Sequence, residues 1–293
     1  MTHVFSLGIA VLDTVYSCQT IPDAATKYKA NAIETVTGGG ASNAAIAIAK
    51  LGGHAHLAAR LGDDPQGAAI RADLAAHGVN VDALHVTPNG QTSSSSIIVD
   101  QKGERQIVNF RGANLSDSTK WITLPGATKS VLADTRWPAG LHRALALAQK
   151  ANIPGIVDVD TPLDACDFSN ATHLAFARHA LTEMTQETDI AAGLLQVAKR
   201  YKAWACVTDG AAGCYMLQGG EMLRIPAPKV AVVDTLGAGD VWHGAFALRL
   251  AEGAPETEAC RFANAAAALK CTQKGVANGM PDRATVDKLS EER

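Results

Sequence analysis

The stretch that decides the fold reads Val230-Ala-Val-Val-Asp-Thr-Leu-Gly-Ala-Gly-Asp240, and the amphipathic run Val241–Ala251 follows it. The valines predict a strand and the glycines a tight turn that leads into a helix. The first free N–H groups of a helix can bind an anion, and Asp240 beside them could accept a proton from a hydroxyl group. An isolated Gly-x-Gly-Asp is more often a simple helix cap, so the rest of the chain has to decide.

The rest of the chain alternates short apolar runs with alanine-rich helical stretches, which predicts a mostly parallel sheet covered on both faces. The apolar runs are Val4–Val11, Val131–Ala133, Ile153–Val159, Ala203–Thr208 and Val230–Val233. The helical stretches include Ser42–Leu51, Pro65–His77, Leu141–Ala151 and Val241–Ala251. We find no internal repeat and no linker, so we expect residues 1–293 to form one large α/β domain.

Two polar, strand-like inserts interrupt this alternation, at about residues 14–37 and 92–112. Within the second insert, Ser94–Val99 and Arg105–Phe110 flank a turn and predict a hairpin. We expect both inserts to build a small separate sheet that stands off the main domain.

The composition excludes several classes of protein. The 26 basic and 29 acidic residues give a formal charge of −3, without a basic cluster, so we expect neither nucleic acid nor an anionic membrane as a partner. The N-terminus lacks the basic start of a signal peptide, and no apolar stretch is long enough to span a bilayer. The six cysteines are scattered, which favours reduced thiols in the cytoplasm.

The segment Asp234–Asp240 resembles the DTxGAGD signature of the ribokinase/PfkB family of sugar kinases. Further family motifs are matched in the same order along nearly the whole chain: Gly8–Asp13, Gly38–Ala45, Leu61–Gly67 and Val207–Gly213. The resemblance implies a ribokinase-like fold, in which a three-layer, Rossmann-like α/β domain carries a small β-sheet lid made by the two inserts. It also implies an ATP-dependent carbohydrate kinase that uses Mg²⁺, and a homodimer that pairs through the lids.

The resemblance also implies roles for individual positions. Asp240 would be the catalytic base, with the backbone of Gly237, Ala238 and Gly239 as the anion hole. The sugar would be held by Asp13, Gly39, Gly40 and Asn43. The nucleotide would lie along Thr208, Gly210 and Gly213, with Asn264 near its base or ribose. No metal ligand among the side chains is expected, because Mg²⁺ would reach the phosphates through water.

One family motif is missing. The family usually carries NxxE, which is tied to the handling of Mg²⁺ and phosphate, whereas this chain has Ala175–Glu183 without that pattern. Arg178 or Glu183 could substitute for the missing residues. The departure also makes a non-catalytic sugar- or nucleotide-binding protein conceivable, although such a binder gains nothing from an intact Asp240. Walker A, protein-kinase and GxGxxG dinucleotide motifs are absent.

Several segments resemble sulfofructose kinases, a PfkB subgroup of sulfoglycolysis. They are Lys27-Tyr28, Gly103–Asn109, Leu132–Trp137 and Ala267–Thr272. In that subgroup Lys27, Asn109 and Arg136 would bind the sulfonate of 6-deoxy-6-sulfofructose, whose 1-hydroxyl group is phosphorylated. Arg111 departs from the subgroup, so fructose or a phosphorylated or acidic ketose stays open as the substrate. The alternative enzymes are a fructokinase, a ketohexokinase or a 2-keto-3-deoxygluconate kinase. Each of the three residues is equally typical of an ordinary surface or ion-pair position.

The remaining polar and aromatic residues receive structural interpretations. We regard the nine histidines as dispersed, without a metal-ligating pair, and expect no zinc site. His243 is expected to be a packed or surface residue. Trp137 either stacks on a substrate or fills the base of the lid.

Overall fold

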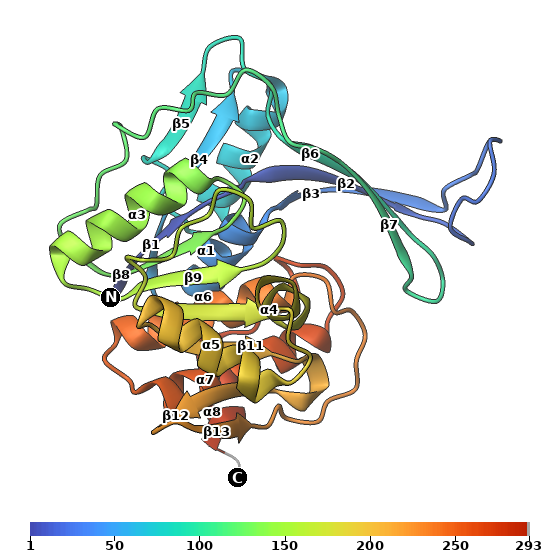
Figure 1. The fold of residues 1–293 in the computed structure, drawn as a ribbon. Helices are drawn as coiled ribbons and strands as arrows, with labels where there is room; N and C mark the ends of the chain where they lie inside the picture. Colours follow the sequence, from blue (N-terminus) through green and yellow to red (C-terminus); the bar gives the residue numbers. More distant parts are fainter. Residues whose placement is uncertain (292–293) are drawn as a thin grey trace.

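The fold is built around a nine-stranded sheet that is covered by helices on both faces (Figure 1). The computed structural model describes residues 1–291. The strand order is β13-β12-β11-β10-β9-β8-β1-β4-β5, parallel except at the β11-β12-β13 edge. These strands are β1 (His3–Leu7), β4 (His54–Gly62), β5 (Leu84–Thr87), β8 (Thr128–Asp134), β9 (Gly155–Val159), β10 (His173–Ala177), β11 (Trp204–Thr208), β12 (Cys214–Gln218) and β13 (Glu221–Ile225).

Two hydrophobic cores lie on opposite faces of this sheet, and each is closed by its own helices. One core is covered by α1 (Gly40–Lys50), α2 (Pro65–Ala76), α6 (Ala238–Ala251), α7 (Glu256–Cys271) and α8 (Arg283–Glu291). The other is covered by α3 (Pro138–Ala151), α4 (Arg178–Thr185) and α5 (Ile190–Tyr201). The strands of such a sheet are buried on both faces, which explains why they read as continuous apolar runs rather than as alternating patterns.

A second sheet of four strands projects from the main body as a lid (Figure 1). Its order is β3-β2-β6-β7, with β2 (Val11–Ser17), β3 (Ala32–Gly38), β6 (Ser94–Val99) and β7 (Arg105–Phe110). The hairpin predicted in the second insert is confirmed at both of its strands. The two inserts also meet as expected, because β2 pairs with β6 in parallel.

The first apolar run is split where one continuous strand was expected. Strand β1 ends at Leu7, and β2 begins at Val11 in the other sheet. Gly8 lies at the break, and a Cβ atom there would be 2.0 Å from Oδ2 of Asp134. The chain therefore bends around a buried carboxylate, which local hydrophobicity cannot reveal.

The prediction of a strand at Val230–Val233 is wrong. The segment is an extended loop outside both sheets, and Val232 and Val233 are more than 60% exposed. The backbone N–H groups of Val233 and Asp234 donate to the carbonyl of Cys271, at 2.7 and 3.1 Å. Valine favours a strand only where a neighbouring strand can pair with it. Here the segment hydrogen-bonds to the end of α7 instead of to a strand.

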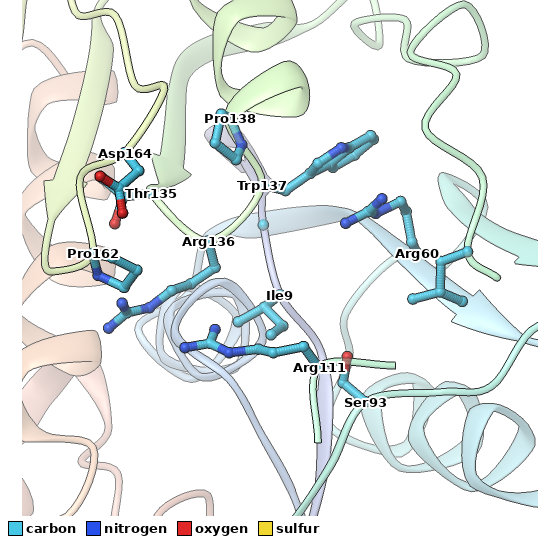
Figure 2. Close-up of a pocket in the computed structure, with 12 residues that line it drawn as sticks. Ile9, Arg60, Ser93, Arg111, Thr135, Arg136, Trp137, Pro138, Pro162 and Asp164 are labelled. Carbon is cyan, nitrogen blue, oxygen red and sulfur yellow. The ribbon is translucent and has the colours of Figure 1, made fainter. Parts of the chain in front are cut away.

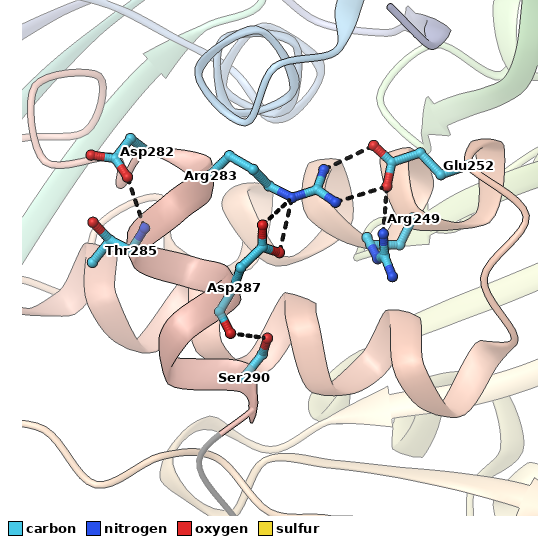
Figure 3. A network of polar contacts seen from close by, with 7 residues as sticks. All are labelled: Arg249, Glu252, Asp282, Arg283, Thr285, Asp287 and Ser290. Carbon is cyan, nitrogen blue, oxygen red and sulfur yellow. Dashed lines mark hydrogen bonds and ion pairs between the residues drawn. The ribbon is translucent and has the colours of Figure 1, made fainter.

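The C-terminal helix α8 is tied to the end of α6 by a small ion-pair network (Figure 3). Arg283 pairs with Glu252 at 2.8 Å and with Asp287 at 3.0 Å, and Arg249 also pairs with Glu252, at 2.6 Å. Because Glu252 lies just after α6, the network fixes the far end of the helix whose first turn carries Asp240.

Candidate active site

Asp240 and Asn43 meet where α6 and α1 begin. Asn43 Nδ2 donates to Asp240 Oδ2 at 2.6 Å. The two helices touch at backbone distance, because a Cβ atom on Gly244 would lie 2.6 Å from the carbonyl oxygen of Ala44. The glycine in α6 thus sets the spacing that brings two predicted site residues together.

The turn before Asp240 carries the first N–H groups of α6, of which that of Ala238 donates to the carbonyl of Thr235 at 3.2 Å. Gly237 has a left-handed φ of 76°, and a Cβ atom there would lie 2.6 Å from Val276. None of the described side chains caps α6, and the side of Gly239 is open, with no described atom within 4 Å of a Cβ placed there. A negatively charged group can therefore approach the first turn of α6 without meeting a side chain.

Asp234 anchors this turn from the other side. Its carboxylate accepts from the N–H groups of Leu236 and Gly275, and Lys270 Nζ donates to its backbone carbonyl at 2.9 Å. Lys270 is fully buried, and burial lowers the pKa of its ammonium group against the opposing effect of Asp234. Burial alone would raise the pKa of Asp234, but these hydrogen bonds and the Lys270 charge hold it below its usual value.

Asp240 belongs to a group of three carboxylates, with the buried Asp134 and the half-buried Asp158, of which sequence reasoning identified Asp240 alone. A Cβ atom on Gly40 would lie 3.6 Å from Asp158 Oδ2, 3.6 Å from Asp240 Oδ1 and 3.8 Å from Asp134 Oδ2. Asp134 ends β8, and Asp158 lies in β9, which pairs with it. The available signal was their position, since ligands of open α/β sheets bind at the carboxyl ends of the strands.

Burial, and to a smaller extent neighbouring charges, shifts the pKa values of these carboxylates. Burial and the Asp158 charge raise the pKa of Asp240 to about 7. Burial and the charges of Asp134 and Asp160 raise the pKa of Asp158 to about 8. His243 lies 3.5 Å from Asp158 but is itself buried, and burial lowers the pKa of its imidazole. Asp240 is thus poised to accept a proton near neutral pH.

Asp13 and Asn109 are joined through the lid. Asn109 Nδ2 donates to Ser95 Oγ at 2.8 Å, and Ser95 in turn hydrogen-bonds Asp13. Burial raises the pKa of Asp13 to about 6, against the opposing effect of the Ser95 hydrogen bond. A Cβ atom on Gly38 would lie 1.9 Å from Asp13 Oδ2, so only glycine leaves room for this carboxylate.

Gly39 precedes α1, which begins at Gly40 rather than at the predicted Ser42. Gly39 has a left-handed φ of 97°, and a Cβ atom there would lie 2.4 Å from the carbonyl oxygen of Ile9. This close approach joins the first Gly-rich turn to the bend after β1.

Arg136 lies in a pocket of about 250 Å³ together with two other arginines, Arg60 and Arg111 (Figure 2). One guanidinium nitrogen of Arg136, Nη2, pairs with Asp160, whereas Nη1 is buried and has no hydrogen-bond partner within the described residues. Burial and the Arg136 charge lower the pKa of Arg111. Arg60 pairs with Asp117 and stacks 4.4 Å above the ring of Trp137. The buried Trp137 therefore has a packing role at this pocket.

The arginine pocket adjoins the carboxylate group. Asp134 accepts the backbone N–H of Arg136 at one oxygen and that of Ile9 at the other. Asp134 therefore connects Arg136, which lines the pocket, with the carboxylate group around Gly40. Lys27, by contrast, is exposed in the segment between β2 and β3 and does not line this pocket.

The residues expected along a nucleotide lie at the end of β11 and in the turn after it. Thr208 Oγ1 donates to the carbonyl of Phe176, Gly210 begins a 3₁₀ turn, and Gly213 passes so close to Ile225 that a Cβ atom would lie 2.1 Å from its carbonyl oxygen. Arg178 pairs with Asp209 in this segment, whereas Glu183 is exposed on α4. Of the two residues considered for the missing NxxE motif, Arg178 is therefore the one beside the loop.

Asn264 was expected near the base or ribose of the nucleotide, and in the structure both its amide oxygen and its amide nitrogen hydrogen-bond protein groups. It is buried, its Oδ1 accepts from Trp242 Nε1 at 2.8 Å, and its Nδ2 donates to the carbonyls of Ile225 and Pro226. The amide is thus committed to the protein interior, and its role is to hold the segment after β13.

The α/β fold, the covering lid and the helix terminus beside Asp240 suit a phosphotransferase of small molecules. Comparison with known proteins agrees, since residues 1–283 match the pfkB family of carbohydrate kinases. A ribokinase from Bacillus subtilis is 30% identical over 99% of both chains. This chain therefore belongs to the pfkB family, and it is an ATP-dependent sugar kinase.

Two crystal structures support the same conclusion. A candidate ribokinase from Agrobacterium tumefaciens is 34% identical, with a TM-score of 0.93 over 99% of this chain and 98% of that one. The Arabidopsis thaliana ribokinase complexed with ribose and ATP is 28% identical, with a TM-score of 0.85 over 100% and 99% of the two chains. Both confirm the ribokinase-like fold, including the four-stranded lid.

Proposed function

We propose that this kinase transfers the γ-phosphoryl group of ATP to a ketose that carries an anionic group at its far end, with the 1-hydroxyl group of 6-deoxy-6-sulfofructose as the first candidate acceptor. The observation that carries the proposal is the buried, unpartnered Nη1 of Arg136 beside Arg111. A buried donor without a partner is costly, and a sulfonate, phosphate or carboxylate would satisfy it.

The position of the arginines supports an acceptor that bridges two sites. The anionic group would lie against Arg136 and Arg111, and the reacting hydroxyl group would lie at Asp240. Asp134 connects these two ends, since it accepts the backbone N–H of Arg136 and is one of the three carboxylates around Gly40. A neutral ketose would leave the arginine pocket unsatisfied.

In the proposed mechanism Asp240 takes the proton of the acceptor hydroxyl group. The N–H groups of Gly237 and Gly239 stabilise the charge of the transferring phosphoryl group, and that of Ala238, which donates to the carbonyl of Thr235, would join them only by giving up that bond. Asn43 holds Asp240 by its 2.6 Å hydrogen bond, and Asp13, steadied through Ser95 and Asn109, orients sugar hydroxyl groups.

Mg²⁺ is a proposed cofactor, and the donor set fits it. Asp158 is a carboxylate beside Asp240 whose facing imidazole, His243, has a lowered pKa and so offers little positive charge. Carboxylate oxygens and water are the ligands that Mg²⁺ prefers. Asp158 would hold the ion, directly or through water, and the ion would neutralise phosphate charge.

A cytoplasmic location is also part of the proposal. It is supported by the requirement for ATP and by six cysteines that form no disulfide in residues 1–291. None of the helices in that range has the length and apolar character that a bilayer crossing requires.

The test is ATP consumption with Mg²⁺ across sulfofructose, fructose, fructose 6-phosphate, ribose and 2-keto-3-deoxygluconate. We expect one anionic ketose to exceed fructose in kcat/KM by about a hundredfold, since hydrogen bonds to charged groups contribute roughly 1.5–3 kcal/mol each. Preference for fructose or ribose would overturn the anionic substrate but leave the kinase intact.

Arg136→Gln separates the substrate from the enzyme class. We expect KM for the anionic ketose to rise by about ten- to a hundredfold, while turnover of fructose changes little. The exposed Arg261 on α7 offers the matched control, Arg261→Gln, which should alter neither. Equal losses for fructose and the anionic ketose would contradict the role of Arg136.

A further inference from the structure

The expectation that the histidines are dispersed is wrong in one place. His54 and His56 form a His-x-His pair on β4, and the structure brings His3 beside them. His3 and His54 are direct register partners in the parallel pair β1-β4. Since side chains two residues apart on a strand point to the same face, His56 joins them there.

The three imidazoles are in close mutual contact. His3 Nδ1 lies 3.0 Å from His56 Nε2. The ring centroid of His54 lies 4.4 Å from that of His3 and 4.7 Å from that of His56. One nitrogen from each ring can be chosen so that all three lie within 4.8 Å of one another.

We propose that His3, His54 and His56 form a binding site for a borderline divalent transition-metal ion, with Zn²⁺ as the first candidate. Imidazole nitrogens favour Zn²⁺, Ni²⁺ and Cu²⁺ over Mg²⁺ or Ca²⁺, which prefer oxygen. Zn–N bonds of about 2.0–2.1 Å require nitrogens roughly 3.3 Å apart around a tetrahedral ion. The His3–His56 pair is already near that spacing, and small rotations of the half-buried His3 and His54 rings would close the rest.

The surroundings of the cluster suit a bound metal. His56 is buried, at 7% exposure, so its ring orientation is fixed by packing, whereas the other two rings are half-buried and leave a path for the ion. The side chain of Asn80 hydrogen-bonds the imidazole of His56, and its Nδ2 donates to the carboxylate of Asp82 at 2.9 Å. Such outer groups orient metal-binding imidazoles.

The proposed site is separate from the kinase site. His3 and His54 begin their strands, whereas Gly8 and the carboxylate group lie beyond the carboxyl end of β1. A bound ion would link the first strand of the chain to β4, about fifty residues further along. It would therefore act as a clip on the folded state rather than as a catalytic metal.

The test uses the full chain without a histidine tag, stripped of metal by a chelator and titrated calorimetrically with Zn²⁺. We expect one equivalent to bind with micromolar or tighter affinity. Loss of one ligand in His54→Gln should weaken binding by at least about tenfold. The matched control is His77→Gln at the end of α2, which should bind as the wild type does.

Two further measurements keep the proposal falsifiable if a variant is poorly folded. Co²⁺ should give the visible absorption of a tetrahedral nitrogen site in the wild type and lose it in His3→Gln, whose circular dichroism should match the wild type. Saturating Zn²⁺ should raise Tm by several degrees, reversibly with chelator, because it binds only the folded state. Equal Zn²⁺ affinity in the His54 and His77 variants, or no binding at all, would overturn the proposal.

Discussion

At the scale of single residues, Asp240 combines two properties that a general base for a sugar hydroxyl group needs. It is fixed by Asn43, and burial together with the Asp158 charge brings its pKa to about 7. An ordinary aspartate would be ionised at neutral pH but would be a weaker base. In the proposed mechanism the surrounding carboxylates therefore contribute to the chemistry as well as to the architecture.

The first prediction concerns Asp240 itself. Asp240→Ala should reduce kcat by about two to four orders of magnitude, the range for loss of a general base. ATP binding, measured by calorimetry, should change little, because the nucleotide is expected along the turn after β11. Near-wild-type turnover in this variant would exclude Asp240 as the base.

The second prediction concerns pH. Because the pKa of Asp240 is raised to about 7, its base form is lost below that value, and kcat/KM should rise with pH through a midpoint near 7. Because the pKa of Asp158 is raised to about 8, the two carboxylates titrate as a pair, and Asp158→Asn should leave a single titration with its midpoint at lower pH. The remote change Asp82→Asn serves as the control. An unmoved midpoint in Asp158→Asn would assign the titration to the substrate or ATP instead.

Much of this residue-scale description was available from the sequence, and the remainder has clear physical reasons. Asp240 and Asn43 lie in motifs that are contiguous along the chain, so their type and spacing identified them. Asp134 and Asp158 come from separate strands, and only the sheet order brings them to Gly40. The burial that shifts their pKa values is likewise a property of the fold.

At the scale of elements, the contact between α1 and α6 controls the site. Each helix carries one partner of the Asn43–Asp240 hydrogen bond, and their separation depends on Gly244. The sequence pattern predicted the first residue of each helix to within three residues, but it could not give the distance between the two helices. The Val230–Val233 loop shows the same limit, since its strand-like composition is overruled by hydrogen bonds to Cys271.

The third prediction tests this contact through Gly244→Ala. Alanine in a helix interior is ordinarily favoured over glycine by about 1 kcal/mol. Here the added Cβ atom would lie 2.6 Å from a backbone oxygen, and overpacking of this kind costs about 1–3 kcal/mol. We therefore expect a net loss of up to about 2 kcal/mol in the free energy of unfolding by urea, together with lower kcat.

The control for Gly244→Ala is a second helical glycine. A Cβ atom on Gly193 in α5 would meet only side-chain atoms, of Leu181 and Thr185, at 3.2 Å or more. Because side chains shift more readily than backbone, Gly193→Ala should change stability by less than about 1 kcal/mol and leave kcat unchanged. Stabilisation by Gly244→Ala would show that the two helices can separate without cost.

At the scale of the whole molecule, the edge strands of the lid expose large apolar side chains to solvent. Ile33 on β3 is 64% exposed, and Ile107 and Val108 on β7 are 53% and 68% exposed. Both strands are edges of the four-stranded sheet, and unpaired edges with apolar side chains favour pairing with another chain. We propose that two copies pair through their lids, as the sequence also led us to expect.

The last prediction is that the protein in solution has twice the 30.5 kDa mass of one chain, measured by light scattering after size exclusion. Val108→Asp should shift the mass toward one chain, because a carboxylate would be buried without a partner in the paired lids. Met222 on the edge strand β13 is 47% exposed and gives the matched control, Met222→Asp, which should stay dimeric. Since the lid also carries Asp13 and Asn109, the dissociated variant should bind the sugar more weakly while it still binds ATP. A wild-type protein with the mass of one chain at micromolar concentration would contradict this assembly, and the exposed strands would then have to be covered by the closing of the lid alone.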